Sequence, residues 1–370
     1  MLDREATIVL NMIPGIGHVR YTALKEAFGS PAAVFGRTAE ELEAVPGVGP
    51  QLAEKVASYD WEAGLRAELD LCDRAGVRIL TLWDEAYPQI LRTLYDPPLC
   101  LYVRGKLPPF PNNAVAVVGT RRMTPYGQQM ADRLIGELAD RVPDTVIVSG
   151  LAFGIDTACH RAALAFGMPT VGIIASALPG ITPAQHTAVA RDMIEHGGAV
   201  VSELHSQTRQ NGNFYHSRNR LLAGISGGTV VVESPAEGGS MDTARLADGY
   251  NRTLMAVPGR ATDFASAGTN LLIRTQRAQM VCTGEDIVRE MMWDQNRPGD
   301  LIDRPTAAPA ALTRDEEGLL GCFRTDDPIS AEELCELSGL GFGELSALLL
   351  GLEMAGAVRQ LPGNRYMKLI

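Results

Sequence analysis

Two arginines stand in a glycine turn between an apolar stretch and a helical stretch, within residues 113–134 (NAVAVVGTRRMTPYGQQMADRL). Gly119 lets the backbone turn sharply and come close to a ligand. A strand that leads into a helix through such a turn points free backbone N–H groups at whatever lies above it, and Arg121 and Arg122 add positive charge there. The chemistry predicted for this turn is the binding of an anion such as phosphate.

The turn sequence GTRRMTPYG is not the GxGxxG fingerprint of dinucleotide-binding proteins, so it indicates an anion without naming the ligand. The alternative is a plain strand-to-helix connection whose arginines are solvated.

A second basic stretch, residues 205–222, holds three arginines and two histidines and no acidic residue. Binding of a single nucleic-acid strand needs cations along the backbone and flat side chains for the bases. Arg218 and Arg220 are two residues apart and cannot share one helix face, so we expect Arg218 to face the ligand and Arg220 to brace the loop. The other groups suited to this chemistry are Arg209 and the aromatic residues Phe153, Phe214 and Tyr215, whose alternative is core packing.

No arrangement for nucleophilic catalysis stands out. Adjacent Cys159 and His160 point to different helix faces and make no dyad, and we read His160 as structural. Asp156 is expected to cap the helix that follows it. The six cysteines are scattered without a CxxC pair, which indicates neither a disulfide framework nor a zinc site.

The elements that must position these residues alternate between strand and helix from residue 113 to about 290, which predicts a doubly wound parallel sheet. Ligands bind such sheets beyond the carboxyl ends of the strands. The expected strands are Val115–Val118, Thr145–Ser149, Thr170–Ala175, Ala199–Ser202, Thr229–Glu233 and Thr253–Val257. The expected helices are Tyr126–Asp140, Gly154–Phe166, Gln185–Glu195, Ser217–Ala223 and Ser240–Gly249.

The flanking regions have other patterns. Residues 1–65 read as short helices around two related turns, IPGIG (13–17) and VPGVG (45–49), as in a helix-hairpin-helix, for which DNA contact and structural packing are both open. Residues 65–104 suggest a βαβ-like lead-in to the sheet. Residues 313–370 have the pattern of a winged helix whose recognition helix opens with Phe342 and carries no basic side chain at its start, which favours a protein-contact or structural role.

Length and charge set the outer limits. A chain of 370 residues exceeds one ordinary core, so the prediction is a helical domain at 1–65, a Rossmann-like core at 66–293, a Pro-rich linker at 294–312 and a winged-helix-like domain at 313–370. The net charge of −11 allows nucleic-acid binding if positive charge is concentrated. No apolar run reaches transmembrane length and the start is acidic, so a cytoplasmic protein is expected.

Five ordered motifs resemble the DNA-processing protein A family (DprA or Smf): VVGTRRMTPYG, VSGLAFGIDTACHRAAL, VVSELHSQTRQNGNFYHSRNRLLAGIS, VVVESPAEGGSMDTARLA and AVPGRATDFASAGTNLLI. The resemblance implies a Rossmann-like core, binding and protection of single-stranded DNA, and help in loading the RecA recombinase during natural transformation. It also implies a homodimer formed through the core, no catalytic activity, and no metal or nucleotide cofactor.

Motif residues and local chemistry together predict the DNA-binding set Gly119, Thr120, Arg121, Arg122, Ser149, Gly150, Phe153, Tyr215, Arg218, Asn219, Arg220, Gly239 and Ser240. The loop 175–186 departs from the family's pattern, with Pro179, Thr182 and His186 at positions where other residues are usual. Its contribution to binding is therefore open.

Two competing classes remain. Nucleotide phosphoribohydrolases share this type of fold, and GGSMDTARL (238–246) is similar to their PGGxGTxxE motif, but Leu246 stands where the catalytic glutamate should be. The other class is a structural adaptor that binds protein partners through its end domains. Salt-sensitive binding of oligo-dT favours a single-stranded DNA-binding protein. Release of ribose phosphate from AMP favours the hydrolase, and the absence of both activities favours the adaptor.

Overall fold

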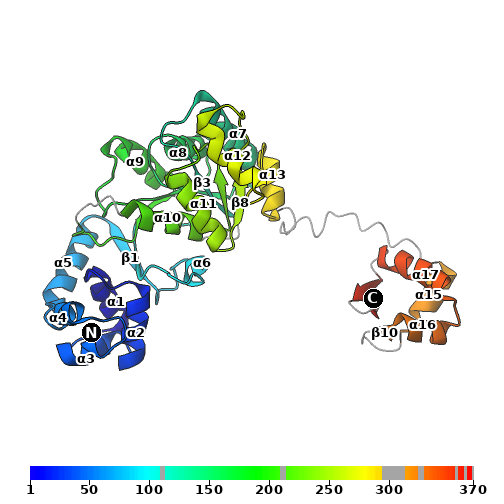
Figure 1. Ribbon diagram of the computed structural model, residues 1–370, viewed down its shortest axis with the longest axis horizontal. Coiled ribbons are helices and arrows are strands. Elements are labelled where there is room, and N and C mark those ends of the chain that lie inside the picture. The colour runs from blue at the N-terminus through cyan, green and yellow to red at the C-terminus, as the bar shows by residue number, and fades with distance from the viewer. Residues whose placement is uncertain are drawn as a thin grey trace. The chain divides into compact units, whose positions relative to one another are not determined.

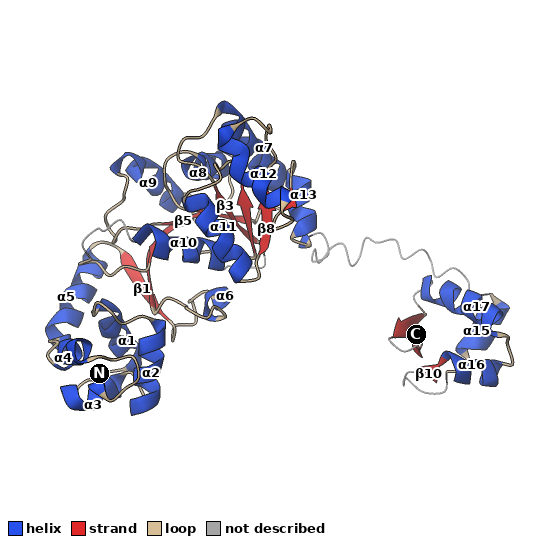
Figure 2. Cartoon of the chain, viewed as in Figure 1, coloured by secondary structure: helices blue, strands red, loops and turns tan. Residues whose placement is uncertain are grey.

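The computed structural model describes residues 1–108, 113–208, 214–293, 313–323, 329–354, 357–361 and 365–368. These divide into two compact units, residues 1–294 and 295–370. The first unit is an α/β core with a helical N-terminal part, and the second is a small winged unit (Figures 1 and 2). The predicted linker 294–312 and Arg209 lie outside the described residues.

The core is one sheet in the order β1-β2-β6-β5-β4-β3-β7-β8-β9, and its strands from β6 to β9 are all parallel. Each strand expected between residues 113 and 257 is present, with ends that differ by at most two residues from those predicted. Their bounds are β3 Ala114–Val118, β4 Val146–Ser149, β5 Thr170–Ile173, β6 Ala199–Ser202, β7 Gly228–Val231 and β8 Thr253–Ala256. The structure adds the short strand β9 (Gln279–Met280), which was not predicted.

Helices cover both faces of this sheet because its strands are apolar on both sides. In β3, Val115 and Val117 pack against one set of helices, whereas Ala114 and Val118 pack against the other. The first set comprises α7 (Pro125–Arg141), α8 (Ile155–Ala165) and α13 (Gly284–Glu290). The second comprises α6 (Gln89–Arg92), α10 (Phe214–Gly224), α11 (Gly239–Gly249) and α12 (Ala267–Arg274), while α9 (Thr187–Glu195) lies against β5 and β6.

The predicted βαβ lead-in is wrong. Strands β1 (Val77–Thr81) and β2 (Cys100–Gly105) pair antiparallel, and β2 pairs antiparallel with β6. The connection between β1 and β2 contains only the four-residue helix α6, which is too short to carry the chain back for a parallel pairing.

The N-terminal helices pack on this antiparallel extension. Arg4 of α1 donates through Nε to Asp84 Oδ1 (2.9 Å), and the Trp83 indole donates to Thr7 Oγ1 (2.9 Å). The two predicted hairpin turns are linked by Arg20, which donates to the carbonyl oxygens of Gly15 (2.6 Å) and Gly47 (2.8 Å). The helices are α1 Asp3–Met12, α2 His18–Phe28, α3 Ala39–Glu43, α4 Pro50–Ala57 and α5 Trp61–Arg74.

The winged unit contains α15 (Arg314–Leu320), α16 (Ala331–Ser338) and α17 (Phe342–Met354), with a sheet ordered β10-β12-β11. The strands are β10 Ile329–Ser330, β11 Val358–Leu361 and β12 Arg365–Lys368. The sequence FGELSALLLGLEM of α17 has no lysine or arginine. Among the described residues no single helix could cross a membrane, and one bent pair, α16 with α17, passes by length and composition alone.

Candidate nucleic-acid interface

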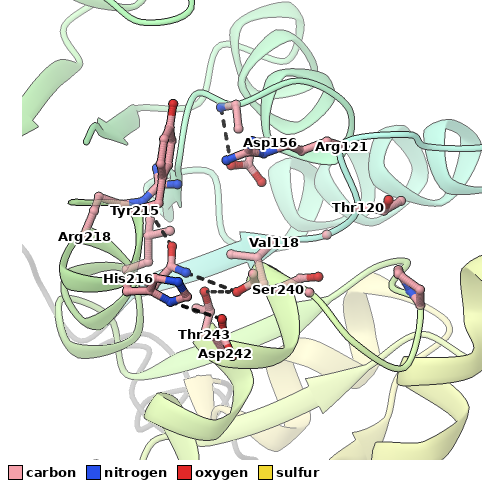
Figure 3. Close-up of a pocket in the computed structure, with 17 residues that line it drawn as sticks. Val118, Thr120, Arg121, Asp156, Tyr215, His216, Arg218, Ser240, Asp242 and Thr243 are labelled. Atoms are coloured by element: carbon pink, nitrogen blue, oxygen red, sulfur yellow. Dashed lines mark hydrogen bonds and ion pairs between the residues drawn. The ribbon is translucent and has the colours of Figure 1, made fainter. Parts of the chain in front are cut away.

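A cavity of about 540 Å³ lies beyond the carboxyl ends of β3, β4 and β7 (Figure 3). The chain moves outward from β3 through β4, β5 and β6 and then returns to the other side of β3 with β7. This reversal leaves a crevice, because the helices that follow β3 and β7 cover opposite faces of the sheet. The cavity therefore occupies the position at which doubly wound sheets bind ligands.

The turn between β3 and α7 is held rigidly by Glu233, which follows β7. Thr120 N donates to the Glu233 carbonyl oxygen (2.7 Å), while Thr124 donates through N (2.8 Å) and Oγ1 (2.6 Å) to the Glu233 carboxylate. A Cβ at Gly119 would lie 2.5 Å from the Ile155 side chain, so only glycine fits there. The turn thus has a fixed shape.

Arg121 is exposed in this turn and lines the cavity. Its guanidinium carbon lies 4.7 Å from the centroid of the Tyr215 ring, and within the described ranges the side chain has neither a hydrogen bond nor an ion pair. Such a cation–π contact orients the guanidinium. It leaves the N–H groups of Arg121 available to donate hydrogen bonds to a phosphate. Arg122 is also exposed, but it does not line the cavity.

Arg218 lines the same cavity. Contrary to the expectation, its side chain is not free to face a ligand. Its Nη1 donates to the carbonyl oxygens of Gly150 and Ile173, each at 2.6 Å, and its Nε donates to Asn219 Oδ1 (3.2 Å). The residue is only 5% exposed. Arg218 therefore ties α10 to the ends of β4 and β5 and braces the cavity wall.

The other two residues of the RNR motif separate. Asn219 lines the cavity and donates through Nδ2 to the Gly239 carbonyl oxygen (3.2 Å), which joins α10 to α11. Arg220 points away from the cavity and pairs with the Glu203 carboxylate, and its Nη1 donates to Asp96 O (2.5 Å). The predicted bracing role of Arg220 agrees with these contacts.

Ser149 and Gly150 lie beneath the cavity. Ser149 is fully buried and donates to the Val117 carbonyl oxygen (2.6 Å), so it serves the sheet. A Cβ at Gly150 would come closer than 3.0 Å to both Arg218 and Asp156. Gly150 therefore makes the room in which Arg218 and the carboxyl of Asp156 are buried together.

The expectation that Asp156 caps α8 with its side chain is wrong. Its Oδ2 accepts from Ala152 N (3.4 Å), and it is almost entirely buried. Burial raises the pKa of Asp156, and the nearby positive charge of Arg218 opposes that rise. The cavity thus contains one buried carboxyl whose proton affinity depends on the buried arginine.

Phe153 borders a smaller hollow of about 80 Å³, which shares Arg121 and Tyr215 with the main cavity. The Phe153 ring is 46% exposed and meets the His186 ring edge-on, with centroids 4.7 Å apart. His186 Nδ1 donates to the Leu151 carbonyl oxygen (2.8 Å). The divergent loop 175–186 therefore supplies a histidine that supports an exposed aromatic ring.

The first turn of α11 completes the cavity. Among the described residues, the backbone N–H groups of Gly239 and Ser240 have no hydrogen-bond acceptor, as is usual for the start of a helix. Ser240 Oγ lies 2.8 Å from Ser234 Oγ. This turn can bind an anion through backbone groups and the helix dipole.

The predicted DNA-binding set omits two polar residues of the lining, His216 and Asp242. Asp242 Oδ2 lies 3.4 Å from His216 Nδ1, and Asp242 also pairs with Arg245. His216 belongs to the acid-free basic stretch, but nothing in the sequence showed that α11 would bring a carboxylate to it. Within the part of the chain that the structure describes, no group of three or more His, Cys, Asp or Glu side chains could hold a metal ion.

The fold and the cavity define a class: a Rossmann-like core with a crevice at the carboxyl ends of its parallel strands, preceded by helix-hairpin-helix turns and followed by a winged unit. The family profile of DNA recombination-mediator protein A matches residues 78–292. Profiles of a SAM-like helix-hairpin-helix tandem and of the DprA winged helix domain match residues 8–58 and 303–364. The chain belongs to the DNA-processing protein A family.

Individual relatives support this family assignment. Protein Smf of Escherichia coli is 32% identical over 289 residues, which cover 77% of this chain and 75% of that protein. DNA processing protein DprA of Bacillus subtilis is 33% identical over 217 residues, or 58% of this chain and 72% of that protein.

Two solved structures share the fold. The X-ray structure of DNA processing protein A from Streptococcus pneumoniae has a TM-score of 0.65 at 27% identity and covers 78% of this chain and 98% of its own. The protein from Helicobacter pylori, whose structure is described for a unique single-stranded DNA binding mode, has a TM-score of 0.51 at 30% identity. That match covers 60% of this chain and 98% of the other.

Proposed function

We propose that this protein binds single-stranded DNA along the carboxyl edge of its sheet, with one phosphate at Arg121 and the start of α11. The observation that carries the proposal is the exposed Arg121 guanidinium, which forms no ion pair in the described chain and is held against Tyr215 on a rigid turn. The single-stranded DNA binding reported for the Helicobacter pylori relative supports it.

The kind of nucleic acid follows from the neighbouring side chains. Phe153 presents an exposed ring, and Tyr215 lines both the main cavity and the smaller hollow. Rings in these positions can stack only on bases that are not already paired in a duplex. No base-specific hydrogen-bonding pattern is needed, so binding is expected to tolerate different sequences.

The cellular role in this proposal is that of the family: protection of incoming single strands and loading of the RecA recombinase in the cytoplasm during natural transformation. A homodimer formed through the core would align two cavities and raise the affinity for longer strands by avidity. The motif resemblance described above supports these roles.

The direct test measures fluorescence anisotropy of labelled oligo-dT between 50 and 200 mM salt. Arg121→Ala is expected to lower affinity about tenfold and to reduce the salt dependence by roughly one phosphate contact, because one backbone cation is removed. Circular dichroism should show an unchanged fold. Unchanged affinity in a folded Arg121→Ala, Tyr215→Ala double variant would contradict the site.

The alternative of a phosphoribohydrolase has less support. Leu246, at the position expected for the catalytic glutamate, packs partly buried against the apolar core on the α11 side of the sheet. The acids of the cavity lining are Asp156 and Asp242, which serve the buried arginine and a surface ion pair. Release of ribose phosphate from AMP by the purified protein, lost in an Asp242→Asn variant, would reverse this judgement.

A further inference from the structure

The loop between β8 and α12 carries a phenylalanine that is almost entirely in water. Phe264 is 80% exposed, and the four residues before it are exposed as well. A phenyl ring left in solvent forgoes the free energy that its burial would release. A side chain in that position is available for contact with a ligand.

The loop that displays this ring is fixed in place. The Asn270 side chain accepts from Gly259 N (3.1 Å) and donates to Gly259 O (3.1 Å), so it binds both backbone polar groups of that residue. The Tyr126 hydroxyl donates to Pro258 O (2.6 Å), and Ser266 N donates to Asp263 O (3.1 Å). Because the backbone is already ordered, a contact with Phe264 loses little further entropy.

The loop is also continuous with the cavity described above. Pro235 lines the cavity, and the residue before it, Ser234, accepts through its carbonyl oxygen from Gly268 N (2.8 Å) at the start of α12. A Cβ at Gly268 would lie closer than 3.0 Å to Pro235 O. Since β7 and β8 are neighbours in the parallel sheet, the loops that follow them lie side by side at its carboxyl edge.

We propose that Phe264 is a base-stacking position at the far end of the DNA path, one that extends the path beyond Pro235. This inference rests on the proposed function. Phe153 follows β4 and Phe264 follows β8, and the order β4-β3-β7-β8 puts three strand spacings between them. Three spacings are roughly 14 Å, the length of about four stacked nucleotides.

The chemistry of this position is stacking and not charge neutralisation. Arg260 is exposed on the same loop, but the exposed Asp263 beside Phe264 offsets its charge. A ring in this setting binds any base through its face and makes no sequence-specific hydrogen bond. Removal of the ring should therefore change affinity without changing the dependence of affinity on salt, in contrast to removal of Arg121.

The experiment compares full-length wild type, Phe264→Ala and Phe264→Tyr for binding to labelled dT3 and dT12 over a salt series. Phe264→Ala is expected to weaken dT12 binding roughly 5- to 150-fold, as for the loss of about 1–3 kcal/mol of base stacking. Its affinity for dT3 and its salt slope should equal those of the wild type, and Phe264→Tyr should retain tight binding. Phe166→Ala removes a half-exposed ring at the other end of α8 and should leave dT12 binding unchanged.

The outcomes separate this inference from the proposed function. If dT12 binding depends on Arg121 but not on Phe264, the stacking position is wrong and the DNA site stands. If the wild type binds no oligo-dT, both are wrong. If Phe264→Ala changes the oligomeric state in light scattering, the ring belongs to a contact between subunits and the inference is overturned.

Discussion

Arg121 in the β3–α7 turn and Arg218 in the first turns of α10 both approach Tyr215, with guanidinium carbons 4.7 and 6.0 Å from the centroid of its ring. Arg121 is exposed and has no polar partner in the described chain, whereas Arg218 is buried and donates to two carbonyl oxygens and an amide. The two arginines line one cavity, yet one can bind a ligand and the other holds the walls together.

The difference shows that a basic residue in a binding motif need not contact the ligand. A guanidinium can donate five hydrogen bonds in a fixed plane, so one side chain can bind several backbone carbonyl oxygens at once. In this protein those oxygens belong to Gly150 and Ile173, at the ends of β4 and β5. Three predictions test that division of roles, in addition to the tests of Arg121 and Phe264.

The largest effect is expected at Arg218. Arg218→Ala should lower the free energy of unfolding by about 3–5 kcal/mol, because Asp156 loses its buried counter-charge and two carbonyl oxygens lose their donor. Urea unfolding followed by circular dichroism measures the loss. Arg218→Lys keeps the charge but not the fork and should recover only part of it. A wild-type unfolding midpoint for Arg218→Ala would show that the two arginines do not differ as described.

The next effect concerns His160 in α8, the helix that packs against β4 and β5. His160 Nδ1 donates to Thr170 Oγ1 (2.7 Å), and within the described part of the chain its buried Nε2 has no hydrogen-bond partner. Burial lowers the pKa of His160 to about 3. Below pH 6.5 the imidazole of His160 is protonated in the unfolded chain, whereas in the folded chain it stays neutral down to about pH 3. The free energy of unfolding should therefore fall as pH falls, by up to roughly 1.4 kcal/mol per pH unit.

His160→Gln isolates this contribution. Urea unfolding of the variant between pH 6.5 and 5 should show a shallower loss of stability than that of the wild type. Parallel slopes for the two proteins would mean that the histidine is not held neutral. The result also sets the pH range within which the arginine variants stay folded, so that their DNA affinities can be compared.

The smallest effect is expected at Arg122. Its exposed side chain lies outside the cavity lining, although it is adjacent in sequence to Arg121. Arg122→Ala should change oligo-dT affinity by less than about twofold, within the range of surface charges away from a binding site. The same anisotropy assay measures it. A loss as large as that of Arg121→Ala would place the DNA over the outer side of the turn.

Much of the fold was predictable because its signals are local. The apolar run from Ala114 to Val118, the glycine after it and the cap at Thr124 each depend on neighbouring residues only, and the structure shows all three. The lead-in was predicted wrongly because pairing direction depends on where β1 and β2 meet the rest of the sheet. The support of Phe153 by His186 was not predictable either, since the two residues lie 33 positions apart in the sequence.

The sequence by itself determined the strand–turn–helix units, the ordered motifs of the family and the chemical character of the basic stretch. Only the tertiary structure decided which arginine is free. The partners that bury Arg218 are carbonyl oxygens 68 and 45 residues away, and a linear pattern does not contain that proximity. Burial and hydrogen bonding are properties of the packed chain, so two arginines of the same type acquired different roles when β4, β5 and α10 came together.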